Sequence, residues 1–234
     1  MRAGGLDPLG PLVSRPLRRD VGLAGVTARP AKSLSLNLDY EGATTDTAYF
    51  RTSLYNYHRM RARARYQPIA SLSFQANFAI LSNENPALDI HYDLQSRSSS
   101  IAAYWTPAGG KNITVMAEYT RSTLRSSIDY LLLPFLTPSV SLYRENAHTG
   151  VSTLDIVLPK VGGIAAKLTA GGSLFVSSGT RATSYYQPLG RFSLPVHKHV
   201  QWNTEWRWYG FGETAYLYEG FRAHLFMTGV KLTK

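Results

Sequence analysis

The chain contains no cysteine among its 234 residues. A disulfide framework, a thiolate metal site, a cysteine nucleophile and a covalently attached c-type haem are therefore excluded. It also has no run approaching the ~20 apolar residues of a transmembrane helix. Its longest apolar cluster, LLLPF at 131–135, is short and contains a proline. A helical membrane protein is excluded, whereas a membrane β-barrel is not, because its strands alternate between polar and apolar residues.

The sequence also lacks a sustained 3.6-residue period, which is the mark of amphipathic helices. From residue 32 onward the period is two, as in KSLSLNLDYE, ASLSFQANFAI and NITVMAEYT, and successive side chains on a strand point to opposite faces. The pattern predicts an all-β chain of about ten strands. Their expected ranges are 32–41, 54–67, 69–82, 95–106, 111–122, 145–158, 163–178, 184–195, 199–211 and 221–233.

Residues 1–31 are rich in Pro, Gly and Arg, and we expect an irregular segment there, followed by a barrel domain over 32–234. The basic patch at 15–19 precedes only a short, glycine-rich apolar stretch, VGLAGVTA, which makes a poor export signal. The segment therefore favours either a piece of a longer exported protein or a misassigned start.

The expected connections alternate in length. Short ones hold Pro68, Pro107, Pro159 and Pro195, and the longer links are 42–53, 83–94, 123–144, 179–183 and 212–220. Outer-membrane barrels have tight periplasmic turns and longer extracellular loops, and their strands run to about ten residues. The alternation therefore favours a transmembrane, antiparallel, up-and-down β-barrel over a soluble, lipocalin-like ligand-binding barrel, which remains the alternative.

The two faces of the expected strands differ in chemistry. In LYNYHRMRARARYQ four arginines occupy alternate positions, and an arginine facing lipid near the bilayer midplane costs ~2–4 kcal/mol, so we expect them to face a wet lumen. The predicted lumen-lining residues are Arg59, Arg61, Arg63, Arg65, Glu118, Lys167, Arg191, Glu205 and Arg207. The predicted lipid-facing girdle residues are Tyr40, Tyr66, Trp105, Tyr119, Tyr186, Trp202, Trp206 and Trp208.

The arginine row has two interpretations. It could attract anionic solutes into a pore through a focused field. Alternatively, the arginines could pair with acidic residues on neighbouring strands, such as Asp39, Glu118 or Glu205, because buried charges are usually paired.

Other candidate sites have weaker support in the sequence. His197 and His199 share a strand face, but two ligands are too few for a metal site, so neither a metal nor another cofactor is predicted. DIHYD at 89–93 aligns Asp89, His91 and Asp93, which would suit a hydrolase at the barrel rim, although a solvated loop explains it as well. We predict no enzyme. The net charge of +10 is spread along the chain without a reader motif, which argues against nucleic acid as a partner.

Three stretches carry a family resemblance: SLYRENAHTG (141–150), SYYQPLGRFSLPVHKHVQWNTEWRWYGFGE (184–213) and YLYEGFRAHLF (216–226). They resemble the C-terminal portion of large bacterial outer-membrane β-barrels of the acidobacterial type, over roughly residues 32–234. The resemblance implies insertion by the barrel-insertion machinery, although the chain ends VKLTK instead of in the commonly recognised aromatic residue. Related sheath porins wrap multihaem cytochromes, and a haem would here have to come from a partner.

The sequence therefore predicts a Gram-negative outer-membrane barrel, either of about ten strands or the last ten of a larger one. We expect a porin-like channel or a structural barrel, with membrane lipid and anionic solutes as partners. A closed barrel of about ten strands would be nearly filled by its own side chains. The alternatives are a soluble ligand-binding barrel and a sheath for an electron-transfer protein.

Overall fold

The structure is a computed structural model that describes residues 18–46, 52–86, 91–107, 112–132, 137–197, 199–213 and 222–232. These residues form eleven β-strands, which confirms the all-β prediction. The strands are β1 (Arg19–Ala31), β2 (Leu34–Thr45), β3 (Asn56–Ile69), β4 (Leu72–Asn85), β5 (Tyr92–Trp105), β6 (Ile113–Leu132), β7 (Thr137–Val157), β8 (Lys167–Gly179), β9 (Thr183–His197), β10 (Val200–Glu213) and β11 (Arg222–Leu232). No helix in the described ranges is long and apolar enough to cross a membrane.

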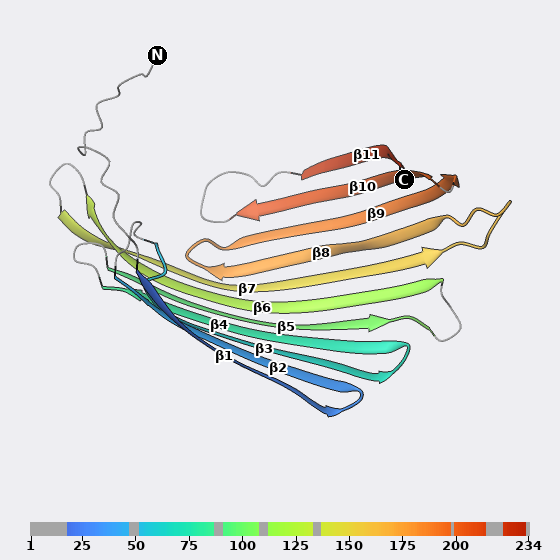
Figure 1. The fold of residues 1–234 in the computed structure, drawn as a ribbon. Coiled ribbons are helices and arrows are strands. Elements are labelled where there is room, and N and C mark those ends of the chain that lie inside the picture. The colour runs from blue at the N-terminus through green and yellow to red at the C-terminus, as the bar shows by residue number, and fades with distance from the viewer. Residues whose placement is uncertain are drawn as a thin grey trace, which may run out of the picture.

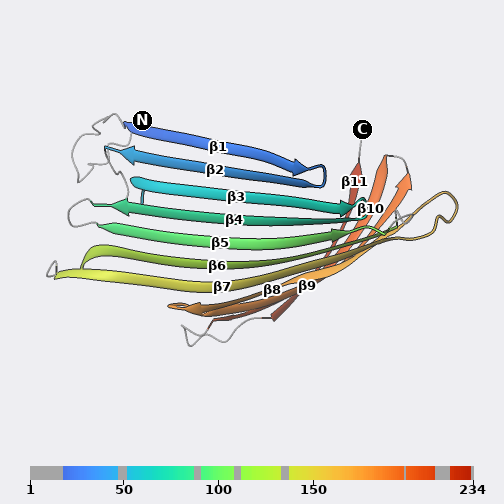
Figure 2. The ribbon, with the colours of Figure 1, turned by 90° about the horizontal axis from the view of Figure 1, so that it is seen from below.

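The strands form a single sheet in the order of the sequence, and every neighbouring pair is antiparallel. The sheet is curved, with β1 and β11 at its two edges (Figure 1). Seen from below, β9–β11 cross the direction of β1–β5 steeply, which reflects the twist that accumulates in a large sheet (Figure 2). Within the described residues, β1 and β11 each pair with one neighbour only.

The N-terminal segment differs from its prediction, because residues 19–31 form β1 instead of irregular chain. β1 pairs with β2 from Arg19 opposite Thr45 to Ala31 opposite Leu34, with a register shift after Ala28. The segment was not predicted as a strand because it contains glycine and proline, which are uncommon in strands. Backbone hydrogen bonds to β2 hold these residues in a strand despite their low intrinsic preference for one.

The connections also differ from the predicted alternation. Most of the expected long link at 123–144 is strand, because β6 and β7 continue as a hairpin that projects beyond its neighbours (Figure 1). The connection at 158–166 is longer than the one at 180–182, so short and long do not alternate strictly. Pro68 and Pro195 lie inside β3 and β9, near the strand ends, and not in the turns.

The register defines two faces of the sheet, since directly opposed residues share a face. Leu38 opposes Ala62 on what we call the apolar face, and Asp39 opposes Arg61 on the polar face. The register of the remaining strand pairs assigns the residues of every other strand, from β1 to β11, to one of these two faces.

Neither face is covered by another layer of the described chain. Large apolar side chains stay exposed on the apolar face, including Leu38, Ile101 and Phe226. The buried hydrophobic residues among those described are only Ala43, Tyr57, Tyr92, Ala102 and Ala147. A soluble barrel would need its apolar face packed inside, so this distribution argues against that alternative.

Candidate functional site

The nine residues predicted to line a lumen all lie on the polar face. They do not form a single site. Register places four of them on β3, another four on β8–β10, and Glu118 alone on β6 between these groups. The first group is therefore a column along one strand, and the second spans three neighbouring strands.

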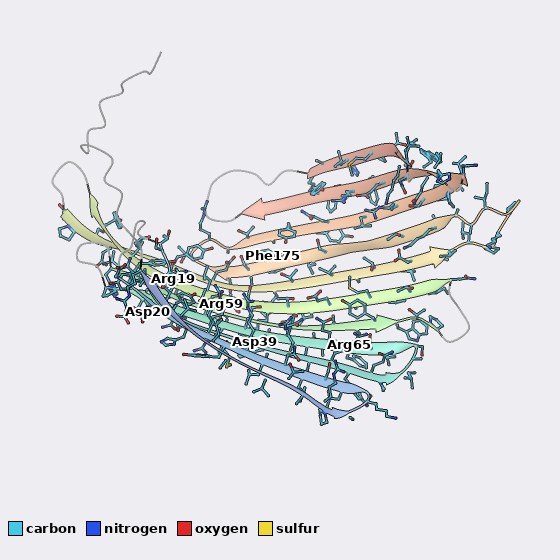
Figure 3. All side chains as sticks on the ribbon, viewed as in Figure 1. Arg19, Asp20, Asp39, Arg59, Arg65 and Phe175 are labelled. Atoms are coloured by element: carbon cyan, nitrogen blue, oxygen red, sulfur yellow. The ribbon has the colours of Figure 1, made fainter. Side chains whose placement is uncertain are left out.

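The β3 column is only partly neutralised. Nη1 of Arg59 lies 3.2 Å from Oε2 of Glu41, and Nη2 of Arg63 lies 3.0 Å from Oδ2 of Asp39. In the described part of the chain, no carboxylate is within ion-pair distance of Arg61 or Arg65. Figure 3 shows Arg59 and Arg65 towards opposite ends of the column. Two arginines of the column therefore have carboxylate partners, and two have none among the described residues; attraction of anionic solutes stays a prediction.

Glu41 and Tyr57 belong to this column, although they were not predicted as site residues. The buried hydroxyl of Tyr57 donates a hydrogen bond to Glu41. The guanidinium carbons of Arg19 and Arg59 lie 5.5 Å and 5.6 Å from the centroid of the Tyr57 ring, within cation–π range. The available signal was that Glu41 continues the polar alternation of its strand.

The second group is centred on Glu205, which is 8% exposed. Its Oε2 accepts a hydrogen bond of 2.6 Å from Nε of Arg191, and its Oε1 accepts one from Nε of Arg207. Beside it, Nζ of Lys167 lies 3.1 Å from Asp155, a residue that the sequence interpretation missed. Every predicted cation of this group therefore has a carboxylate partner.

Uncharged hydroxyl and amide groups occupy most of the polar face between the two groups. Ser98 opposes Ser122, Ser100 opposes Thr120, and Nδ2 of Asn77 donates to Oγ of Ser100 over 3.1 Å. This part of β4–β7, which we call the neutral strip, carries no basic residue on the polar face and separates the β3 column from the cations of β8–β10.

The eight predicted girdle residues all lie on the apolar face. Several contact neighbouring rings: Tyr186 packs edge-on against Trp208 at 5.1 Å between centroids, and Nε1 of Trp206 lies 3.2 Å from Nδ1 of His224. Aromatic rings with polar tips suit the boundary between hydrocarbon and water.

Two further candidate sites from the sequence were the His197/His199 pair and the segment 89–93. The rings of His197 and His199 lie 5.9 Å apart, and no group of three or more potential metal ligands occurs in the described ranges. Asp89 lies outside the described residues, whereas His91 directly precedes β5 and Asp93 lies on it.

No protein-family model matches the chain, and no curated protein matches it by sequence. Solved structures do resemble it. The open form of the ferric-catecholate import receptor Fiu from E. coli K12 gives a TM-score of 0.66 at 9% identity, over 92% of this chain and 48% of the receptor. The closed form gives 0.63 at 10% identity, over 93% and 45%. The copper transporter OprC gives 0.53 at 9% identity, over 94% and 42%.

The strand order, the two unlike faces and these similarities define the class of protein: the chain has the fold of an outer-membrane β-barrel. It spans about half the length of the receptors and the transporter it matches. At this level of identity the likeness establishes the fold. The acidobacterial origin implied by the sequence resemblance stays a prediction.

Proposed function

We propose that the chain forms part of the wall of a large outer-membrane barrel that admits anionic solutes passively. The apolar face contacts lipid, and the polar face lines a wet interior. The observation that carries the proposal is that Arg61 and Arg65 have no ion-pair partner among the described residues and share the polar face of β3 with two paired arginines.

The direction of the strands supports a barrel larger than eleven strands. Because every pairing is antiparallel, β1 and β11 run in the same direction. Joining them would create a parallel pair, and a second copy inserted in the same orientation would offer only the same two edges. Open edges are not tolerated in hydrocarbon, and bacterial single-chain barrels have even strand numbers. An odd number of further strands would meet both requirements, and 22 strands is the size of outer-membrane transporters.

The β3 column would select for charge through its field. Arginines on a low-dielectric wall raise the local potential, which concentrates anions and repels cations. The likeness to an import receptor and a transporter supports solute passage over a purely structural role. The interior needs no catalytic group or resident cofactor for this task. Membrane lipid and the barrel-insertion machinery are the proposed partners of the wall itself.

The test uses the absence of cysteine from these 234 residues, so that an introduced thiol is the only one among them. Ala79 opposes Arg61 on the polar face, Ser122 lies in the neutral strip, and Ala76 lies on the apolar face. Each is changed to Cys in the full chain in outer-membrane vesicles. We then measure reaction rates with an anionic and a cationic methanethiosulfonate of similar size.

We expect the anionic reagent to be favoured severalfold more at Ala79→Cys than at Ser122→Cys, since wall potentials reach several kT. Adding Arg61→Gln and Arg65→Gln should abolish the difference. Equal preferences at the two positions would overturn the proposed selectivity. Rapid labelling of Ala76→Cys would overturn the placement of the apolar face in lipid.

A further inference from the structure

Four neighbouring arginines form a cluster on the apolar face, apart from Arg222 on β11, which lies on the same face. They are Arg97 on β5, Arg121 and Arg125 on β6, and Arg144 on β7, and all four are exposed. Together with Gln95, Glu145 and Asn146 they line a groove of about 450 Å³, which extends to Ser178 and Gly179 on β8. We call this group the arginine patch.

The register brings like charges together. Arg125 directly opposes Arg144, while Arg97 opposes Thr123, the residue between Arg121 and Arg125 on that face. Directly opposed like charges destabilise a sheet unless something compensates them. The patch has one internal polar contact, from Nε of Arg121 to Oδ1 of Asn146 at 3.3 Å.

Two acidic residues lie close to the patch without forming an ion pair with it. Glu145 lines the groove, although its register places it on the polar face. Asp93, the nearest acid by register on this face, opposes Ser127, which lies beyond Arg125. No ion pair joins Asp93 or any other described carboxylate to the four arginines. The patch therefore presents four positive charges to whatever covers the face.

The level of the patch identifies the environment. On β6 the apolar residues Ile113, Val115 and Ala117 lead to Tyr119, and Arg121 is the next residue on the face. With ~3.3 Å per residue and a tilt of about 40°, Arg121 lies roughly 5 Å and Arg125 roughly 15 Å beyond Tyr119. The patch thus begins where the aromatic girdle ends, at the depth of lipid headgroups.

The patch also lies at one defined end of the barrel wall. It is at the end of β5–β7 that carries the projecting β6–β7 hairpin, away from the tight turns at 32–33 and 70–71 (Figure 1). Tight turns mark the periplasmic end of such barrels. The headgroups at this level are therefore those of the outer leaflet.

From this arrangement we propose that the arginine patch binds the phosphate groups of a phosphorylated glycolipid in the outer leaflet. Guanidinium forks match phosphate oxygens bidentately, and a multiply charged headgroup would compensate Arg125 and Arg144 together. The proposal rests on the proposed placement of the apolar face in lipid, but it is independent of the solute that passes through the interior.

The test measures lipid binding to the complete barrel that contains this chain, extracted into detergent micelles. The probes are lipid A with both phosphates, the same lipid with its phosphates removed, and inorganic phosphate as a competitor. The variant combines Arg97→Gln, Arg121→Gln, Arg125→Gln and Arg144→Gln. The matched control is Arg61→Gln with Arg65→Gln, which removes cations from the opposite face.

We expect the wild type and the control to retain the phosphorylated lipid, and the patch variant to lose roughly fivefold in affinity for each arginine removed. Unchanged binding by the patch variant would overturn the proposal, as would equal binding of the dephosphorylated lipid. Competition by millimolar inorganic phosphate would assign the site to a free anion instead.

If the variant with four substitutions does not fold, the single substitution Arg144→Gln tests the same proposal. Arg144→Gln removes the like-charge opposition, so it should fold at least as well as wild type and still bind the lipid about fivefold less tightly. A folded Arg144→Gln chain with full affinity would also contradict the proposal. The thiol-labelling rates at Ala76→Cys distinguish these results from a failure of the membrane placement itself.

Discussion

The hydroxyl of Tyr40 lies 2.6 Å from Nδ1 of His58 on the neighbouring strand, and the same relationship recurs at 2.7 Å between Tyr119 and His148. In both cases the tyrosine reaches diagonally across the apolar face to a histidine one step nearer the projecting hairpin. Two hairpins far apart in sequence thus build the same pair, in which an apolar ring ends in a satisfied polar tip. Such pairs suit a girdle at the edge of the hydrocarbon.

The Tyr40 hydroxyl should contribute measurably to stability. Tyr40→Phe keeps the ring and removes the bond to His58, so we expect a loss of about 1 kcal/mol in the free energy of unfolding, the usual value of one hydrogen bond. Urea unfolding of the complete barrel in detergent micelles measures it. Tyr66→Phe is the matched control, because the described residues offer its hydroxyl no hydrogen-bond partner, and it should cost less. Equal costs would remove the special role of the pair.

Alternation predicted most of the strands and which of the named residues share a face of the sheet. A polar/apolar period of two is a local property, so it survives in a single sequence wherever one face meets lipid and the other water. For this reason the arginines of β3 and the tryptophans of β10 can each be assigned to one face of their strand from the sequence alone. Their placement on opposite faces is the same in the structure.

The pairing of strands could not be read in the same way. β1 was missed because Val21 and Leu23 fall on one face and Val26 on the other, so its pattern changes phase. The β6–β7 hairpin was cut short because residues 123–144, which include Arg125 and Arg144, resemble a polar loop until their register is known. The arginine patch was missed for the same reason: its members come from three strands and meet only in the sheet.

Glu205 should matter more to stability than the other predicted lumen carboxylate. Glu205→Gln removes the charge that Arg191 and Arg207 share, and we expect a loss of about 2 kcal/mol, discounted because both arginines stay partly exposed. Glu118→Gln, whose described contact is a hydrogen bond from Thr120, should cost under about 0.5 kcal/mol. A double-mutant cycle with Arg191→Gln should give a clear coupling energy, and additive effects would contradict the pairing.

Gly171 should tolerate no side chain. A Cβ there would lie 2.3 Å from the carbonyl oxygen of Ser152, because β7 and β8 approach closely at this point. Gly171→Ala must displace backbone, at a cost of ~1–3 kcal/mol, and should reduce the fraction that folds. Gly190→Ala, where the nearest atom is a Trp206 carbon at 3.8 Å, should fold normally. Unheated against boiled SDS gels report the folded fraction, and equal fractions for the two variants would refute the close approach.

A new positive charge should lower the free energy of unfolding much more on the apolar face of β6 than on its polar face. Ala117 lies on the apolar face between Val115 and Tyr119, so Ala117→Arg puts a guanidinium into hydrocarbon at a cost of ~2–4 kcal/mol, decreasing towards the interfaces. Thr120 lies on the polar face beside Glu118, where Thr120→Arg gains a potential partner and should change stability by less than about 1 kcal/mol.

Unfolding by urea in lipid vesicles compares the two β6 variants directly, since they share the strand, the new residue and the change in net charge. A larger cost for Thr120→Arg would mean that the polar face is packed and the apolar face wet, which reverses the architecture. Equal costs would place β6 outside the bilayer. A selective cost at Ala117 is the result expected if a water-filled interior lies on the side of the β3 arginines and the arginine patch faces lipid headgroups.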